Sequence, residues 1–220
     1  MWVGVMPRVL HAALLVLMLL TGSALHAQEQ NREQAAAALS AADAEARAQA
    51  ASRLGDVGTM ADAKLLVRAL RDADEDVRES AEQALWRLWS RSGNAKVDAL
   101  YATGVRQMSV GDLEQSIATF SQVIKLKPDF AEGWNKRATL YFLVGDLRKS
   151  LADCDHVIKL NPYHFGVLAG YAQIYARMEY YDRALDYSRR ALEVNPNMVG
   201  VQRNIELLEQ LIEQRQRNTI

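Results

Sequence analysis

The side chains best able to do chemistry in this sequence are one cysteine, two histidines and a run of acids. Cys154 and His156 stand two residues apart, and a thiol beside a base is the arrangement of a nucleophilic catalyst. His156 and His164 are candidate metal ligands, and the acidic run at residues 72–76 resembles a calcium-binding loop. Each possibility depends on the elements that carry these residues.

None of these residues has the partners that its chemistry needs. Two steps along a helix rotate a side chain by about 200°, so Cys154 and His156 face apart. The histidines lack suitably spaced acidic or cysteine partners. The acidic run has Val77 where a calcium loop needs glycine and Gln83 where it needs glutamate, so it is read as a helix start. We therefore predict no catalytic residue, no metal site, no cofactor and no enzymatic activity, and no strand or glycine-rich phosphate loop is evident.

Cys154 is the only cysteine, which excludes an intramolecular disulfide. We expect it to be a small hydrophobic residue of the core, with a reactive thiol as the alternative. Without residues 1–27, which hold one basic residue and no acid, the chain carries 25 basic and 27 acidic residues. This balance gives no electrostatic support for binding nucleic acid or a membrane surface.

The elements that position these residues follow a 34-residue period between Val97 and Asn197. Near-copies of one phrase occupy residues 123–128, 157–162 and 191–196, and each ends in proline. A fixed period of this size is typical of stacked helical hairpins. The glycine and aspartate at residues 111–112 and 145–146 predict the turn within a hairpin, and residues 179–182 depart from that pattern.

Within each copy, small and large apolar residues recur at set places. The fourth place holds Leu100, Trp134 and Leu168, the eighth Gly104, Ala138 and Ala172, the eleventh Gln107, Tyr141 and Tyr175, and the twentieth Ser116, Ser150 and Ala184. This pattern resembles the tetratricopeptide repeat family, with Gln107 as the main departure. Residues 128–138 and 162–166 are also similar to small secreted bacterial proteins of that family. The resemblance implies repeats at 97–130, 131–164 and 165–198.

The resemblance also implies a concave groove lined by the first helix of each hairpin. Its second, fifth, ninth and twelfth places are Asp98, Tyr101, Val105 and Met108, then Glu132, Asn135, Thr139 and Phe142, then Gly166, Ala169, Gln173 and Ala176. The candidate peptide-binding residues are Tyr101, Val105, Met108, Glu132, Asn135, Lys136, Thr139, Phe142 and Gln173. The alternative is a groove that is solvated or packed on itself. The carboxylate clamp of some family members is not expected here, because only Asn135 and Lys136 resemble it.

A second repeat with a spacing of 31 precedes this block. Asp43 and Arg47 recur as Asp74 and Arg78, which resembles the Asp and Arg ladder of HEAT-like repeats. We expect helices at about 32–39, 44–56, 60–71 and 75–91. Trp86 and Trp89 share one helix face, which we expect to pack on the first helix of the next block and so form one continuous solenoid. A ligand-binding aromatic pair is the alternative.

Residues 1–27 have the features of a secretory signal: Arg8, an apolar run from Val9 to Leu20, and small residues before a cut after Ala27 or Ala24. The apolar run is short for an uncleaved anchor. No cysteine lies near the cut, so a lipid anchor there is not expected. The expected location is the periplasm or the exterior, with no membrane insertion after cleavage.

Together these patterns predict an all-α, right-handed solenoid. Its parts are a signal peptide (1–27), HEAT-like repeats (28–94), three tetratricopeptide repeats (95–197), and a capping helix from 198 to about 215 within residues 198–220. We expect it to bind an unidentified protein or peptide, as an interaction module or assembly factor of the bacterial envelope. The alternative is a structural or self-associating element whose groove is filled by residues 28–38, by the C-terminal tail or by a second copy.

Overall fold

Helices account for every regular element among the residues that the structure describes. The structure is a computed structural model that describes residue 27 and residues 29–218. A helical segment at residues 29–38 is followed by α2 (Ala44–Val57), the short 3₁₀ helix η1 (Met60–Asp62), α3 (Ala63–Ala69), α4 (Glu75–Trp89), α5 (Ala95–Ser109), α6 (Leu113–Leu126), α7 (Ala131–Leu143), α8 (Leu147–Leu160), α9 (Phe165–Arg177), α10 (Tyr181–Val194) and α11 (Val199–Arg217). No strand occurs in this part of the chain. The predicted all-α fold is confirmed, and the predicted signal peptide lies outside the described residues except for Ala27.

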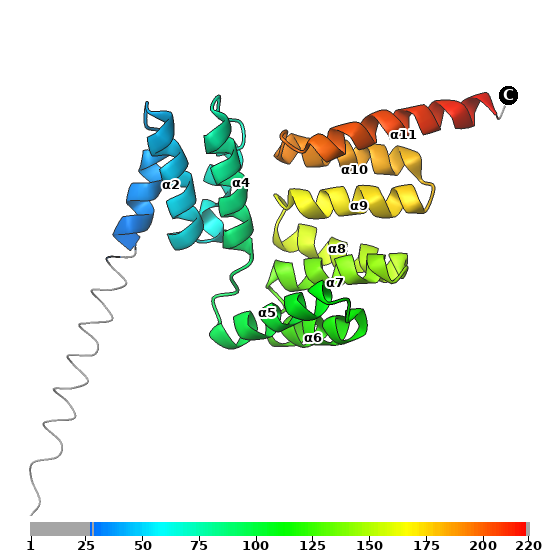
Figure 1. Ribbon diagram of the computed structural model, residues 1–220, viewed down its shortest axis with the longest axis horizontal. Helices are drawn as coiled ribbons and strands as arrows, with labels where there is room; N and C mark the ends of the chain where they lie inside the picture. The colour runs from blue at the N-terminus through cyan, green and yellow to red at the C-terminus, as the bar shows by residue number, and fades with distance from the viewer. Residues whose placement is uncertain (1–26, 28, 219–220) are drawn as a thin grey trace, which may run out of the picture.

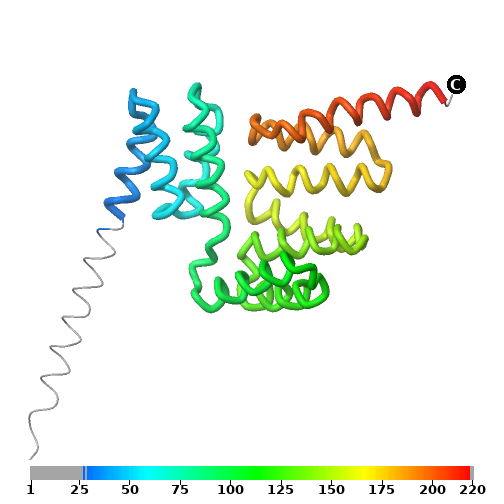
Figure 2. The backbone as a smooth tube through the Cα atoms, in the orientation of Figure 1, coloured from blue at the N-terminus to red at the C-terminus, as the bar shows by residue number. Residues whose placement is uncertain are grey.

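The helices form two blocks, and the helices of one block run crosswise to those of the other (Figure 1). Residues 29–38, α2, η1, α3 and α4 make an N-terminal block, and α5 to α11 make a repeat block in which α9, α10 and α11 lie side by side. In Figure 2 the chain passes from one block to the other at the lower end of α4. The repeat helices then follow one another upward in the view, alongside α4. The far end of the stack is closed by α11, which buries Val201 and Leu208 as the predicted capping helix.

Aspartate caps begin the paired helices of the N-terminal block, as expected. The Asp43 carboxylate accepts from the N–H of Ala46 at 2.9 Å, and Asp74 accepts from the N–H of Asp76 at 3.0 Å. The predicted ladder pairing is corrected in one respect, because Arg47 donates to Asp72 rather than to Asp74. This ion pair is bidentate, with hydrogen bonds of 2.8 and 2.7 Å. Asp74 instead caps the start of α4.

Small residues at the eighth and twentieth places bring the two helices of each repeat hairpin together. A Cβ atom on Gly104 would lie 2.8 Å from the Phe120 ring, so only glycine fits at this crossing. The Ser116 hydroxyl donates to the Gly104 carbonyl at 2.9 Å, and Ser150 donates to the carbonyl of Ala138 at 2.7 Å. The same bond therefore recurs across the first two hairpins.

Gln107, the departure from the apolar pattern, is accommodated by a hydrogen bond. Its side-chain oxygen accepts from the Thr119 hydroxyl at 2.7 Å, so the polar group is paired where other repeats place a tyrosine. The hairpin turns also follow expectation, since Gly111 and Gly145 have φ of 81° and 84°. The third turn uses Glu179 at φ 61°, a non-glycine residue in the left-handed region.

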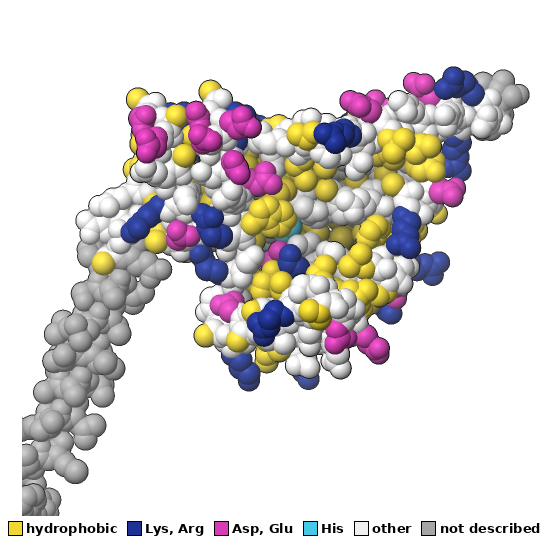
Figure 3. All heavy atoms as spheres, in the orientation of Figure 1, with side chains coloured by type: hydrophobic (Ala, Val, Ile, Leu, Met, Phe, Trp, Pro, Cys, Tyr) yellow, Lys and Arg dark blue, Asp and Glu magenta, His cyan; other side chains and the backbone are white. Residues whose placement is uncertain are grey.

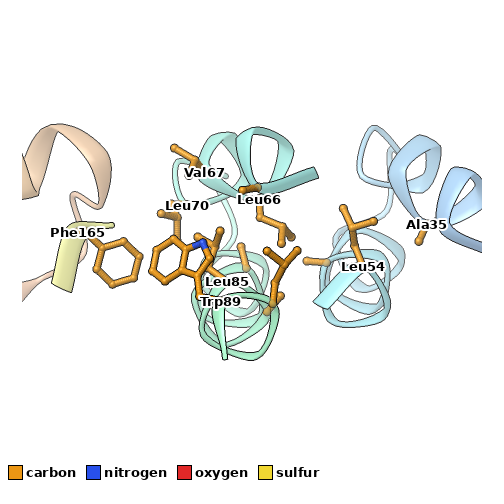
Figure 4. Close-up of a cluster of buried hydrophobic side chains, with 13 residues drawn as sticks. Ala35, Leu54, Leu66, Val67, Leu70, Leu85, Trp89 and Phe165 are labelled. Atoms are coloured by element: carbon orange, nitrogen blue, oxygen red, sulfur yellow. The ribbon is translucent and has the colours of Figure 1, made fainter. Parts of the chain in front are cut away.

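The prediction that Trp86 and Trp89 pack on the next helix, α5, is wrong. Both rings instead contact the start of α9: Trp89 stacks on His164 with ring centroids 4.6 Å apart, and Trp86 meets Phe165 edge-on at 5.2 Å. Figure 4 shows Phe165, which comes from the repeat block, beside the Trp89 indole in the core of the N-terminal block. The two blocks therefore share a core and do not form one continuous stack.

The surface of α5 explains why α4 does not stack on it. In the later repeats the first helix meets the preceding helix through Leu140, and through Val167 and Ile174, which are all buried. At the places matching Leu140 and Val167, α5 has Arg106 and Ala99, which are both exposed. Arg106 places a charged side chain where the later repeats bury Leu140 and Ile174, and Ala99 adds only a methyl group, so α5 has little apolar area to bury against a preceding helix.

Polar groups at the connection between α10 and α11 bind the N-terminal block. Arg71 donates to the carbonyl oxygens of Glu193 and Val194, the second bond being 3.3 Å long. The Asn195 side-chain amide donates to Glu82 at 3.0 Å, and that of Asn197 donates to the Leu70 carbonyl at 2.8 Å.

Candidate functional site

The predicted groove residues of α7 and α9 come together at one cavity. It has a volume of about 60 Å³. Its lining residues come from α7, α8 and α9: Asn135, Ala138, Thr139, Phe142, Ser150, Cys154, Gly166, Val167, Gly170, Gln173 and Ile174. Four of the nine candidate residues, Asn135, Thr139, Phe142 and Gln173, are among them. Figure 3 looks onto this side of the repeat block, where hydrophobic side chains run across the helices.

The three candidates on α5 do not line this cavity. Tyr101 is mostly buried and packs edge-on against Phe120 and Phe130, with ring centroids 5.7 and 5.5 Å apart. Burial and the nearby Glu132 carboxylate raise the pKa of Tyr101 well above its usual range. Met108 is half-buried, whereas Val105 is exposed. Tyr101 is thus a core residue more than a surface contact.

Glu132 is buried, and its carboxylate is held inside the protein. The Asn135 amide donates to its Oε2 at 2.6 Å, His164 Nε2 lies 3.2 Å from the same atom, and Lys136 Nζ lies 3.5 Å from Oε1. Burial by itself would raise the pKa of Glu132, but the hydrogen bond from His164 and the charge of Lys136 bring it below its ordinary value. A partner cannot reach Glu132 in this arrangement, so its predicted role in binding is not supported.

The pairing of His164 with Glu132 is the contact that sequence reasoning missed. The Nδ1 atom of His164 accepts from the N–H of Val167 at 3.1 Å and so caps α9. Because Nδ1 is an acceptor, the ring proton is on Nε2, which donates to Glu132. The 32-residue separation of His164 and Glu132 hid this pair, although both residues sit at the starts of successive first helices, α9 and α7.

The chain itself covers one end of the groove. A Cβ atom on Gly166 would lie 2.6 Å from the Trp86 ring, so the α4 indole rests directly on this groove position. The occupant is α4 and not residues 29–38, because Ala35 and Ala36 pack into the N-terminal block; residue 28 of the predicted segment lies outside the described residues. The tail is not the occupant either, since α11 pairs with α10 through Arg189 and Glu209 at 2.9 Å.

Cys154 and His156 lie in different environments, as their spacing predicted. Cys154 is buried, and burial together with the charges of Asp153 and Asp155 raises the pKa of its thiol to about 12. His156 is exposed and stacks on Trp134 with ring centroids 3.9 Å apart. The described residues contain no cluster of three potential metal-ligating side chains. Over the same residues no helix is both long and apolar enough to cross a bilayer.

Sequence comparisons identify the repeat block. A sequence model of the tetratricopeptide repeat matches residues 166–198, which hold most of α9 and all of α10. A TPR repeat-containing protein of Rhizobium etli is 31% identical over 145 residues, which cover 66% of this chain and 71% of that protein. The chain belongs to the tetratricopeptide repeat (TPR) family. The HEAT-like identity of residues 28–94 stays a prediction.

Solved TPR structures share the fold of this chain. The Sgt2 TPR domain from Aspergillus fumigatus superposes with a TM-score of 0.54 at 19% identity, covering 56% of this chain and 83% of that one. The first TPR domain of Spaghetti (RPAP3), solved with the HSP90 peptide SRMEEVD, gives 0.52 at 18% identity and covers 54% and 94%. TPR proteins are typically non-catalytic scaffolds, and this TPR chain is in general terms a protein-interaction module.

Proposed function

We propose that this TPR protein binds an extended segment of a partner protein across α7 and α9 and has no enzymatic activity. The observation that carries the proposal is the cavity at which Asn135, Thr139, Phe142 and Gln173 meet, because two helices there offer both apolar and hydrogen-bonding groups. The peptide bound by the RPAP3 domain supports this use of the fold.

The proposal includes export to the bacterial cell envelope. Its support is the signal-like sequence at residues 1–27, with an apolar run followed by small residues. Fractionation of cells that express the whole chain tests this part. A mature product beginning at residue 28 or 25 in the periplasmic fraction is expected, and full-length protein retained in the cytoplasm contradicts it.

Site-specific photocrosslinking in the source bacterium tests partner binding. Gln173→p-benzoylphenylalanine places the probe at the exposed mouth of the cavity, and Gln115→p-benzoylphenylalanine is the matched control on α6, also an exposed helical glutamine. We expect a discrete crosslinked product from position 173 and none from position 115. Equal products at both positions, or none at either, would contradict the proposal.

A structural role is the second candidate, and one observation favours it. Trp86 occupies the groove at Gly166, so part of the concave face already serves to join the two blocks. In that case the cavity between α7 and α9 would have no ligand, and the crosslinking experiment would give no product specific to position 173.

A further inference from the structure

The cavity between α7 and α9 owes its depth to a glycine that packing does not require. At Gly166 a Cβ atom would collide with Trp86, but at Gly170 it would meet no atom within 4 Å. Glycine inside a helix costs stability relative to alanine, and no contact among the described residues offsets that cost at Gly170. The missing side chain leaves open space that reaches α8, where Ser150 and Cys154 line the cavity.

Two amide side chains border this space with unused hydrogen-bonding groups. Asn135 is 9% exposed, and its Nδ2 is engaged by Glu132 at 2.6 Å. Its Oδ1 receives no hydrogen bond from any residue that the structure describes. The Gln173 side chain is exposed and makes no hydrogen bond with these residues either. A peptide backbone in extended form presents the complementary N–H and C=O groups.

The size of the cavity limits what can enter it. About 150 Å³ admits the six carbon atoms of benzene, so about 60 Å³ corresponds to a group of roughly two to three heavy atoms. Ala138, Cys154 and Ile174 make much of the lining apolar. No residue that lines the cavity is ionised. The nearby Glu132 carboxylate is buried and bound by His164. A small uncharged apolar side chain fits this description, and an aromatic or charged one does not.

We propose that this cavity selects one small apolar residue, valine with its three side-chain carbon atoms, in an extended peptide whose backbone bonds to Asn135 and Gln173. The inference rests on the proposed function and adds the class of residue that the site accepts. Gly170 then determines specificity, because any larger residue at that position would fill the space that the peptide side chain takes.

Selection from a displayed library of random heptapeptides, with residues 28–220 as bait, tests the inference. We expect the enriched peptides to share one position that holds valine. For a synthetic copy of the best peptide, leucine at that position should raise the dissociation constant at least tenfold, measured by fluorescence anisotropy. Gly170→Leu should weaken binding of the original peptide at least tenfold. A peptide with glycine at the selected position should regain part of the lost affinity for this variant.

Gly200→Leu is the matched control. Gly200 is also helical with no atom within 4 Å of an added Cβ, but it does not line the cavity, so its variant should bind as wild type does. Circular dichroism confirms that both variants fold. This inference is overturned if the enriched peptides share no small residue, or if Gly170→Leu leaves binding intact. In either case the proposed function still stands. No enrichment above the starting library overturns the proposed function and this inference with it.

Discussion

At the scale of single residues, the buried carboxylate of Glu132 organises the contact between α4 and the repeat helices. It receives bonds from Asn135 and His164, and His164 in turn stacks on Trp89 and caps α9. Both hydrogen bonds go to Oε2, while Oε1 has only the Lys136 ammonium 3.5 Å away, and removing one partner of such a buried charge is costly. One ionised side chain thus links α7, α9 and α4.

The Glu132 network should make stability depend on pH in the acid range. The pKa of Glu132 is lower in the folded protein than in the unfolded chain, where it is about 4.3. The Glu132 carboxylate therefore contributes fully to the free energy of unfolding above about pH 4.3. This contribution is lost as the pH falls through the pKa of Glu132 in the folded protein. Glu132→Gln should lower the stability at pH 7 by about 1–3 kcal/mol, and its difference from wild type should shrink towards pH 3.

Thermal unfolding of wild type and Glu132→Gln between pH 3 and pH 7.5 measures this effect. Glu206→Gln is the control, because Glu206 is exposed on α11 and should change little at any pH. A deficit in Glu132→Gln that stays constant across the pH range would show that the carboxylate charge is not responsible.

At the scale of elements, the second helix of each hairpin begins with the same backbone geometry but not the same cap. Asp112 and Asp146 have φ of −80° and −82° and accept from the N–H groups of Gln115 and Lys149. Tyr180 has φ of −88° at the matching place, and its side chain makes no capping bond. The third hairpin therefore leaves the start of α10 without a side-chain partner.

Tyr180→Asp should stabilise α10. A capping aspartate is worth about 0.5–2 kcal/mol over alanine at such a position, and the backbone of Tyr180 already has the conformation of the capped helices. The Tyr180 ring is 54% exposed, so little packing is lost. Chemical denaturation of Tyr180→Asp and Tyr180→Ala isolates the cap, since both remove the ring. Equal free energies of unfolding for the two variants would contradict the prediction.

At the scale of the whole molecule, the N-terminal block depends on the repeat block for its stability. Its paired helices are fewer than the three or so repeats that a stack usually needs to stand alone. Trp89 is 4% exposed and lies in a core that includes Phe165, so the two blocks bury one another's apolar surface. We expect them to unfold together.

Trp89→Ala should separate the unfolding of the two blocks. Truncating a buried tryptophan costs about 3–5 kcal/mol, and here that loss falls on the contact between them. Calorimetry should show one transition in wild type and two in the variant, with the N-terminal block unfolding first. Trp134→Ala is the control, because Trp134 stacks on the exposed His156 and lies outside that contact; it should lower the melting temperature and keep one transition. A single transition in Trp89→Ala would overturn the expectation.

The local structure of this chain could be predicted from the sequence because local signals depend on neighbours along the chain. Prolines at 34-residue spacing, aspartates at helix starts and small residues at helix crossings each act within one hairpin, and the helices end accordingly at Leu126, Leu160 and Val194. Four of the candidate groove residues, all on α7 and α9, line the cavity, and their places were taken from the tetratricopeptide resemblance.

The docking of the two blocks was decided only by the tertiary structure. Periodicity shows that Trp86 and Trp89 share a face, but it does not show which distant surface that face covers. Arg106, at the place where the later repeats have Leu140 and Ile174, was the available signal in the sequence that α5 would not receive them. The burial of Glu132 and the covering of Gly166 follow from that docking, because both depend on contacts between residues far apart in the chain.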